Sequence, residues 1–446
     1  MDLKVSLKTG AWYGDRRIEL PLPSDWDVEV RWPATTPPLS AEELLNTLES
    51  PTGTVALTKI CQGKARPLII VDDLNRPTPT DEIMPYVLKM MGAVGIPTEA
   101  VKILMATGTH GLPSPDAILK KTGSSAADCQ LLIHDCFTNK VRLGVTSYGT
   151  PVFVNRAILE SDVVIGIGGI YPNYTAGFGG GTKLALGVLG IQTIYHLHFR
   201  HKSAGWGNYI EDLDFRRELD EIARMIGMVF NVSLLIDADR RIVKMYCGDP
   251  TAYFPRAVVD YQKMFRTQPP GDADVVISNA YPNDCSLTFA RMKGFLPLNH
   301  CRPGCSRIAI AACSEGLGLH NIWPFVNVPP HHRLKHRFRR LSVLTFKEIL
   351  AKILAKGLHA TQRLLSSRDQ DTLDQNAPDT GEYKPASPVW LYQAGAPETN
   401  LPADVPGIRI TSDWEKIVVA VQQEQSKRGR IKVLVYPCAF LQLLKE

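Results

Sequence analysis

The chain has 446 residues, of which 44% are hydrophobic and 21% charged, a composition ordinary for a globular protein. Its length exceeds one ordinary hydrophobic core, so we expect two or three domains. The net charge of +5 is too small to indicate a nucleic-acid partner. We expect no membrane span, because no run of about 18 apolar residues occurs. We also expect no signal peptide, because Met1–Gly10 lacks an apolar core.

Short alternating segments within the first forty residues indicate edge strands and a long loop. Beyond them, apolar runs typical of buried parallel strands alternate with a helical pattern. The predicted strands cover residues 67–73, 101–107, 130–133 and 162–167, and the predicted helix covers residues 80–92. This alternation predicts an α/β fold with a largely parallel sheet.

The character of the chain changes near residue 268, where Thr267–Gly271 has the composition of a linker. A second series of predicted strands follows, at residues 273–280, 307–312 and 432–436. We therefore predict two α/β domains, residues 1–268 and 269–446, with an active-site cleft between them. Ser412 and Glu415 form a capping-box pattern before the last predicted helix.

The second predicted domain contains a basic helical insertion at about residues 331–388. His331–Arg340 is strongly basic, and residues 346–358 have the apolar spacing of an amphipathic helix. Such a helix usually packs on its own domain, although an anionic membrane or a partner protein is the alternative.

Polar side chains follow the predicted strands of the first domain. In open parallel sheets, ligands bind at the carboxyl ends of the strands. Asp73, Arg76, His110, His134 and the glycine-rich loop at residues 171–183 are therefore expected to converge on one edge of the sheet.

The glycine-rich loop contains Gly179, Gly180 and Gly181 immediately before Thr182 and Lys183. Glycines allow a backbone to approach a ligand closely. The loop does not match the nucleotide-triphosphate motif G-x-x-x-x-G-K-[ST], because Leu184 follows the lysine. A nucleoside triphosphatase is thus disfavoured, and a plain turn with a solvated lysine is the structural alternative.

Several motifs together resemble the lactate racemase family of nickel-pincer nucleotide-dependent 2-hydroxy acid racemases and epimerases. Residues 73–77 match D-x-x-R-P, residues 108–110 match G-T-H, and residues 168–183 resemble the family's glycine-rich lysine loop. Thr193, Ile194 and His198 resemble a downstream T-I-x-x-x-H element, and weaker matches continue at Lys293 and at residues 314–316.

The resemblance implies a nickel-pincer nucleotide covalently attached to Lys183, with His198 as the nickel ligand. The neighbouring His196 and His201 remain alternatives for that ligand. The resemblance also places the cofactor on the first domain, against Asp73, Arg76, Gly179, Gly180 and Gly181. It implies cofactor-synthesis proteins as partners.

The implied reaction is racemisation or epimerisation of a lactate-like, malate-like or sugar 2-hydroxy acid, with hydride moving to and from the cofactor. His110 matches the acid–base group, since a histidine titrates near neutral pH; capping of a helix is its structural alternative. Arg76 and Lys293 would hold a carboxylate or phosphate, or else form ordinary salt bridges.

One catalytic position departs from the family pattern. Asn173 stands where the family has its second acid–base histidine, and asparagine cannot exchange a proton near neutral pH. Tyr174, His134 or water could replace it. Alternatively, the protein performs one-base hydride-transfer or elimination chemistry. A non-catalytic binding protein on the same scaffold is a further alternative, and a homo-oligomer remains open.

The nine cysteines are scattered without a repeating framework. In a chain of this length, that distribution is typical of reduced thiols and predicts a cytoplasmic protein. Cys301 and Cys305 form a C-x-x-x-C pair, but no second pair has zinc-site spacing. We interpret both as structural thiols.

Overall fold

The computed structural model describes residues 3–322, 388–394, 401–402 and 405–445. Its first large sheet has the order β13-β12-β9-β4-β5-β6. The strands are β4 (Pro67–Asp72), β5 (Lys102–Ala106), β6 (Gln130–Ile133), β9 (Val163–Gly169), β12 (Met228–Ile236) and β13 (Ile242–Gly248). All neighbouring pairs are parallel except β12 with β13. The predicted α/β class with a largely parallel sheet is confirmed.

This sheet is covered on both faces, and strand β4 shows why. Ile69 and Val71 belong to one core cluster, whereas Leu68 and Ile70 belong to the opposite one. Since successive side chains of a strand alternate between faces, an uninterrupted apolar run requires a cover on each side. One face carries α1 (Ala41–Glu49), α2 (Leu57–Cys61) and α3 (Thr80–Gly92), and the other carries η3 (Gly181–Val188), α6 (Ile191–Arg200) and α7 (Asp214–Met225).

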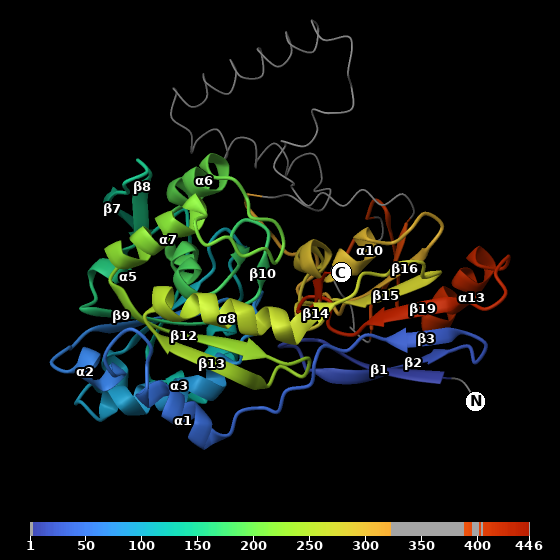
Figure 1. Ribbon diagram of the computed structural model, residues 1–446. Helices are drawn as coiled ribbons and strands as arrows, with labels where there is room; N and C mark the ends of the chain where they lie inside the picture. Colours follow the sequence, from blue (N-terminus) through green and yellow to red (C-terminus); the bar gives the residue numbers. More distant parts are fainter. Residues whose placement is uncertain (1–2, 323–387, 395–400, 403–404, 446) are drawn as a thin grey trace, which may run out of the picture.

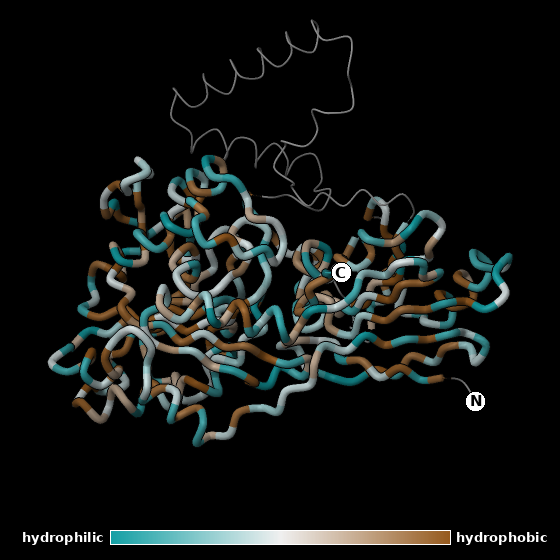
Figure 2. The backbone as a smooth tube through the Cα atoms, viewed as in Figure 1, coloured by the Kyte–Doolittle hydropathy of each residue, from teal (hydrophilic) through white to brown (hydrophobic). Residues whose placement is uncertain are grey.

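The second large sheet has the order β18-β17-β16-β15-β19-β3, and all of its pairs are parallel. Its strands are β3 (Asp27–Val30), β15 (Val275–Asn279), β16 (Ser306–Ile310), β17 (Val389–Tyr392), β18 (Ile408–Thr411) and β19 (Lys432–Tyr436). The hairpin of β1 (Leu3–Thr9) and β2 (Arg16–Leu22) and helix α13 (Trp414–Glu424) cover one face. The other face carries α9 (Leu287–Phe289) and α10 (Leu296–Asn299), joined by the π-helix η4 (Ala290–Gly294). In Figure 2 brown segments run through the central strands of both sheets, in keeping with their buried apolar runs.

Strand β3 gives the chain an interleaved order. It pairs with β19 from the C-terminal end of the chain, so the chain begins on the second sheet and then crosses to the first (Figure 1). The sequence prediction grouped residues 1–40 with residues up to 268, whereas β1, β2 and β3 pack on the second sheet.

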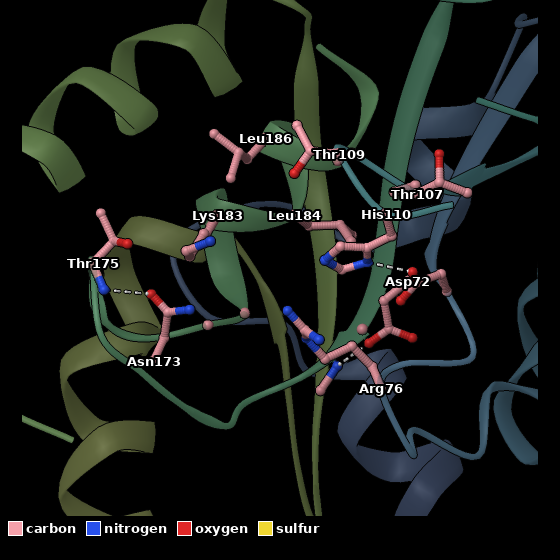
Figure 3. Close-up of a pocket in the computed structure, with 18 of the residues that line it drawn as sticks. Asp72, Arg76, Thr107, Thr109, His110, Asn173, Thr175, Lys183, Leu184 and Leu186 are labelled. Carbon is pink, nitrogen blue, oxygen red and sulfur yellow. Dashed lines mark hydrogen bonds and ion pairs between the residues drawn. The ribbon is translucent and has the colours of Figure 1, made fainter. Parts of the chain in front are cut away.

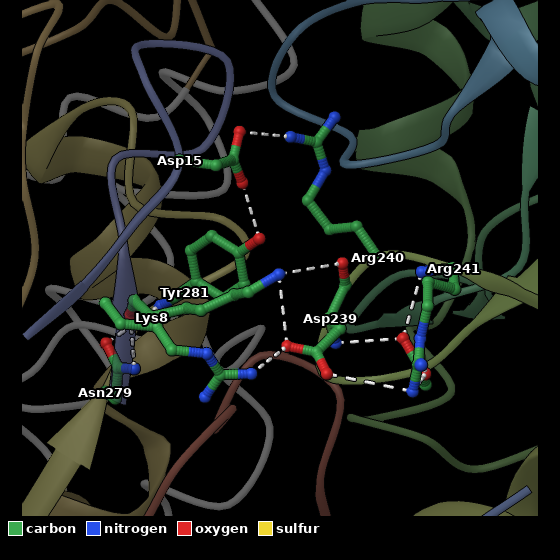
Figure 4. Close-up of polar contacts among 9 residues, drawn as sticks. Lys8, Asp15, Asp239, Arg240, Arg241, Asn279 and Tyr281 are labelled. Atoms are coloured by element: carbon green, nitrogen blue, oxygen red, sulfur yellow. Dashed lines mark hydrogen bonds and ion pairs between the residues drawn. The ribbon is translucent and has the colours of Figure 1, made fainter. Parts of the chain in front are cut away.

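A polar cluster connects the N-terminal hairpin to the turn between β12 and β13 (Figure 4). Asp239 pairs with Lys8 at 3.1 Å and with Arg17 at 2.9 Å. Arg240 pairs with Asp15 at 2.8 Å, and the hydroxyl of Tyr281 donates to the same carboxylate at 2.5 Å. These contacts join the hairpin on the second sheet to the first sheet.

The remaining elements are short. They are η1 (Thr98–Ala100), α4 (Ala117–Thr122), η2 (Ser124–Ala126), β7 (Lys140–Val145), β8 (Pro151–Asn155), α5 (Arg156–Leu159), β10 (Pro172–Asn173), β11 (Gly177–Phe178), β14 (Arg266–Thr267) and β20 (Leu443–Leu444), together with the longer helix α8 (Pro250–Phe265). The predicted cap of α13 was wrong by one residue: Asp413 is the N-cap, and its carboxylate accepts the N–H of Lys416 at 3.1 Å.

The predicted basic insertion at residues 331–388 lies outside the described residues, apart from Pro388. Among the residues that the structure describes, no helix combines the length and the apolar character needed to cross a membrane.

Candidate active site

A cavity opens at the carboxyl ends of the central strands of the first sheet, and residues 289–320 close it from the second sheet. Ten of the site residues predicted from the sequence line this cavity. These residues are Asp73, Arg76, His110, Asn173, Gly179, Gly180, Gly181, Lys183, His198 and Lys293. Figure 3 shows Asn173 and His110 on opposite sides of the pocket, with Lys183 between them.

His110 and Asp73 form a tight pair at the ends of β5 and β4. Nδ1 of His110 lies 2.5 Å from Oδ2 of Asp73. Because a carboxylate can only accept, Nδ1 carries the proton and Nε2 is left as the basic nitrogen. Burial lowers the pKa of His110, and Asp73 raises it. Burial has the larger effect, so this pKa lies below its ordinary value of 6.5. Burial alone would raise the pKa of Asp73, but His110 and then Arg76 hold it well below its usual range.

Asp72 was missed by sequence reasoning, although it lines the cavity beside Asp73. One oxygen accepts hydrogen bonds from the hydroxyl of Thr78 at 2.7 Å and from the N–H of Gly169 at 3.0 Å. The other lies 2.5 Å from Nζ of Lys121, whose side chain is fully buried. Asp72 therefore ties the end of β4 to the turn that carries Arg76 and to the end of β9.

Lys121 strengthens the same junction from helix α4. Its ammonium group also donates to the carbonyls of Arg76 at 2.8 Å and of Asp73 at 3.3 Å. Burial lowers its pKa, and Asp72 opposes that effect. The 73–77 turn is thus held by a buried cation that reaches two of its carbonyls.

The glycine-rich loop runs from β10 and β11 into η3. Gly180 has φ +85° and Gly181 has φ +57°, a region that disfavours other residues. A Cβ at Gly180 would lie 2.8 Å from the carbonyl oxygen of Gly169, so the backbone here approaches β9 closely. This tight turn places Lys183 in the cavity, at the start of η3.

Lys183 has an unusual charge state for a lysine. Burial lowers its pKa to about 7, and the positive charges of Arg76 and Arg216 add to this effect. A substantial fraction of the amine is therefore neutral near pH 7, which makes it a nucleophile.

Of the three histidines on or beside α6, only His198 lines the cavity. Its Nδ1 donates to the carbonyl of Ile194 at 2.8 Å, so the lone pair of Nε2 remains available as a ligand. Burial, followed by the charge of Lys183, lowers its pKa to about 4. His201 instead pairs with the buried carboxylate of Glu218.

The side chain of Asn173 has a defined orientation. Its Oδ1 accepts the backbone N–H groups of Thr175 and Ala176, each at 3.0 Å. Two N–H donors identify this atom as oxygen, so the NH₂ group is the part left to interact with a ligand. Asn173 is therefore a hydrogen-bond donor to the cavity.

Basic groups dominate the remaining cavity wall. Lys293, from the π-helix η4, is 4% exposed, and its ammonium group lies 5.2 Å from the ring centroid of Phe440. Burial holds its pKa well below the ordinary value, and Arg76 and Lys183 act in the same direction. Three basic side chains, Arg76, Lys183 and Lys293, face one cavity and favour an anionic ligand.

The structure corrects the expectation for His134. It is fully buried and is absent from the cavity wall. Its Nε2 lies 2.9 Å from the carbonyl of Leu189, and its Nδ1 lies 3.1 Å from Nδ2 of Asn155. Both ring nitrogens are used in packing η3 and β8, so His134 is structural. His320 and Phe289, which were not predicted, do line the cavity.

Comparisons with known proteins agree with this geometry. Residues 13–207 match the family model described as the lactate racemase N-terminal domain. The chain is 27% identical over 292 residues to a lactate racemase of Lactiplantibacillus plantarum, a match that covers 63% of this chain and 68% of that protein. A lactate racemase of Thermoanaerobacterium thermosaccharolyticum is likewise 27% identical over 291 residues, with the same coverage.

Two solved structures share the fold. The lactate racemase apoprotein of Thermoanaerobacterium thermosaccharolyticum superposes with a TM-score of 0.68 at 20% identity, over the whole of both chains. A structural-genomics protein from Thermotoga maritima superposes with a TM-score of 0.56 at 16% identity, over 92% of this chain and all of the other.

Proposed function

Because the chain belongs to the lactate racemase family, we propose that it is a racemase or epimerase of a 2-hydroxy acid that uses a nickel-pincer nucleotide. One observation carries the proposal. The base His110, the amine of Lys183 with its pKa of about 7, and the basic side chains of Arg76 and Lys293 line one cavity.

The residues present fit such a cofactor. Gly180 and Gly181 form part of the cavity wall, and a side chain at either would collide with Gly169 or Phe254, so the tight loop requires glycine at both positions. Lys183 offers an amine with a pKa of about 7, suited to covalent attachment. His198 offers an uncharged imidazole with a free Nε2, suited to nickel. When bound, the cofactor would supply the hydride acceptor and donor that the side chains lack.

The protein's own part is binding and proton transfer. Arg76 and Lys293 would hold the carboxylate of the substrate. His110 would accept the hydroxyl proton at Nε2, and Asp73 would stabilise the resulting imidazolium through Nδ1. Asp72 and Lys121 would hold the turn that carries Asp73 and Arg76 in place.

The test is to produce the protein together with enzymes that synthesise the cofactor. We expect an added mass on the intact chain, bound nickel and racemisation of 2-hydroxy acids. Lys183→Ala should abolish the adduct while the fold is retained. An unmodified, nickel-free wild type from such cells would contradict the cofactor assignment.

A second candidate keeps the cavity and changes the chemistry. Asn173 donates hydrogen bonds but exchanges no proton, which favours a one-base reaction through His110. Incubation of each enantiomer in deuterated water separates the two candidates. Equal loss of configuration from both enantiomers supports racemisation, whereas conversion of one enantiomer alone supports the one-base reaction.

The remaining expectations about partners stay predictions. The cofactor would require the proteins that make and insert it. A homo-oligomer and a membrane or partner contact through residues 346–358 are untested, and that segment lies outside the described residues.

A further inference from the structure

We propose that His320, carried by the loop that follows β16, is a second catalytic imidazole of this site and transfers the proton that Asn173 cannot. The inference rests on the proposed function. It adds a residue from the second sheet to the reaction.

The backbone places His320 firmly beside the first base. Residues 109–111 and 319–321 pair as a short antiparallel bridge centred on His110 and His320. The N–H of Gly111 donates to the carbonyl of Leu319 at 3.0 Å, and the N–H of Asn321 donates to the carbonyl of Thr109 at 2.7 Å. The amide group of Asn321 reaches the same carbonyl at 3.0 Å. Although the two segments lie far apart in the sequence, their backbones are thus joined directly on either side of the two histidines.

The two rings share one environment. Their centroids lie 5.3 Å apart, and the ring of Phe289 contacts both, at 4.6 Å from His110 and 5.9 Å from His320. Both histidines line the cavity that also contains Arg76 and Lys293. A hydroxy acid held by these two cations therefore has two imidazoles within one wall of its site.

The other candidates for the second proton-transfer group fit less well. His134 is buried outside the cavity, with both nitrogens occupied. His198 is reserved by its proposed role toward nickel. Tyr174 lines the cavity, but its ring packs on Trp206 at 5.0 Å between centroids. Among the imidazoles on the described cavity wall, His320 is therefore the strongest candidate.

The spacing of the rings suits two enantiomers. If the carboxylate and the C2 hydrogen keep their places, the hydroxyl of each enantiomer occupies a different substituent position on C2. The two positions that the hydroxyl takes on C2 lie closer together than the ring centroids of His110 and His320, which are 5.3 Å apart. Each imidazole can therefore exchange a proton with the hydroxyl at one of the two positions. The hydroxyl loses a proton and C2 loses a hydride, and both are later returned to the same atoms, so no external oxidant or reductant is consumed.

Adjacency also completes the proton cycle. When one ring takes a proton from a hydroxyl and the other gives one to the keto oxygen, a proton must pass between the rings before the next turnover. Neighbouring imidazoles can pass it directly or through one water. In the resting site Nδ1 of His320 accepts the N–H of Ile322 at 3.4 Å. Burial holds the pKa of His320 well below the ordinary value, and the nearby basic groups, Lys293 and Arg76 among them, act in the same direction. A bound carboxylate offsets these charges.

The experiment compares cofactor-loaded wild type with His320→Gln, and uses His300→Gln as the matched control, because His300 lies outside the cavity wall. We expect His320→Gln to slow racemisation by a factor on the order of 10²–10⁴, the usual contribution of a general acid or base. A single turnover should still convert one enantiomer to its keto acid, because His110 is intact. His300→Gln should behave like the wild type.

Rescue provides the second measurement. Asn173→His in the His320→Gln background should restore racemisation by at least tenfold, and circular dichroism should show that each variant is folded. If His320→Gln does not fold, ¹⁵N-labelled wild type titrated with lactate and malate takes its place: the imidazole signals of His320 should shift on binding, and unmoved signals would overturn the role.

The outcomes separate the two proposals. Racemisation by His320→Gln within threefold of the wild type overturns the role of His320 and leaves the proposed function standing. Equal loss of keto-acid formation from both enantiomers also overturns it, since His110 alone should serve one of them. A cofactor-loaded wild type that racemises no 2-hydroxy acid overturns the proposed function and this inference together.

Discussion

The carboxylate of Asp73 accepts a hydrogen bond from Nδ1 of His110 at a distance of 2.5 Å, and this contact determines how His110 can act as a base. It selects one tautomer of the imidazole and turns Nε2 into the reactive nitrogen. The two residues end neighbouring parallel strands, so the sheet itself brings them together.

The first prediction concerns pH. The pKa of His110 lies below 6.5, so its neutral, proton-accepting form persists as pH falls through 6.5, and the acid limb of kcat/KM should lie below that value. Asp73→Asn removes a charge that raises this pKa, so the limb should move to still lower pH while kcat falls by roughly 10²–10⁴-fold. The pH profile of racemisation measures both effects. An acid limb displaced to higher pH in Asp73→Asn would contradict the assigned pairing.

The second prediction concerns the amine of Lys183. Because its pKa is about 7, this lysine should be labelled by an amine-reactive reagent in the cofactor-free protein near neutral pH, with half-maximal rate near pH 7. Below that pH the ammonium form dominates and labelling should fade. Peptide mass spectrometry across a pH series gives the profile, and Lys183→Met should lack the labelled peptide. A midpoint near that of ordinary lysine would show that the cavity does not depress the pKa.

The third prediction concerns the buried ion pair of Lys121 and Asp72. Lys121→Met leaves the carboxylate of Asp72 buried without its cation, and breaking a buried pair in this way costs about 3–5 kcal/mol. Lys120→Met is the matched control, because the adjacent Lys120 pairs with the exposed Asp116, and surface pairs contribute about 0–1 kcal/mol. Urea unfolding of both variants measures the difference. Equal free energies of unfolding would mean that the pair stabilises nothing.

The fourth prediction concerns the orientation of Asn173. Asn173→Asp keeps an oxygen for the N–H groups of Thr175 and Ala176, but replaces the donor that faces the cavity with a charged oxygen. The variant should fold normally and bind an anionic substrate at least tenfold more weakly, mainly as a rise in KM. Asn173→Ala, which loses both loop contacts, should also lower thermal stability. An Asp variant with unchanged KM would show that the donor does not meet the substrate.

Local patterns were sufficient for the elements that position the site. Helix α3 spans the predicted residues 80–92, and β4 and β5 begin or end within one residue of their predicted bounds. These elements have uninterrupted apolar runs or clear helical spacing, so their signals are local. Asp73, Arg76 and His110, which follow strands of the first sheet, also reached the cavity, because parallel strand ends share one edge.

The missed residues depend on contacts between distant segments. His320 enters the site through pairing of residues 319–321 with residues 109–111, which no local pattern encodes. Lys121 has the surroundings of an ordinary helical lysine in sequence, and its role appears once α4 packs beside Asp72. His134 was misplaced because a strand end fixes a position along the sheet edge, but does not fix the direction of the ring.

The pairing of β3 with β19 means that the molecule cannot be cut into two self-sufficient halves at the linker near residue 268. A fragment beginning there would expose the edge of β19 and the part of one apolar face that the hairpin covers, since β1, β2 and β3 would remain on the other fragment. A circular permutation that opens the chain at this linker, and joins its two present ends through an added segment, would instead place all strands of the second sheet in one continuous stretch of sequence.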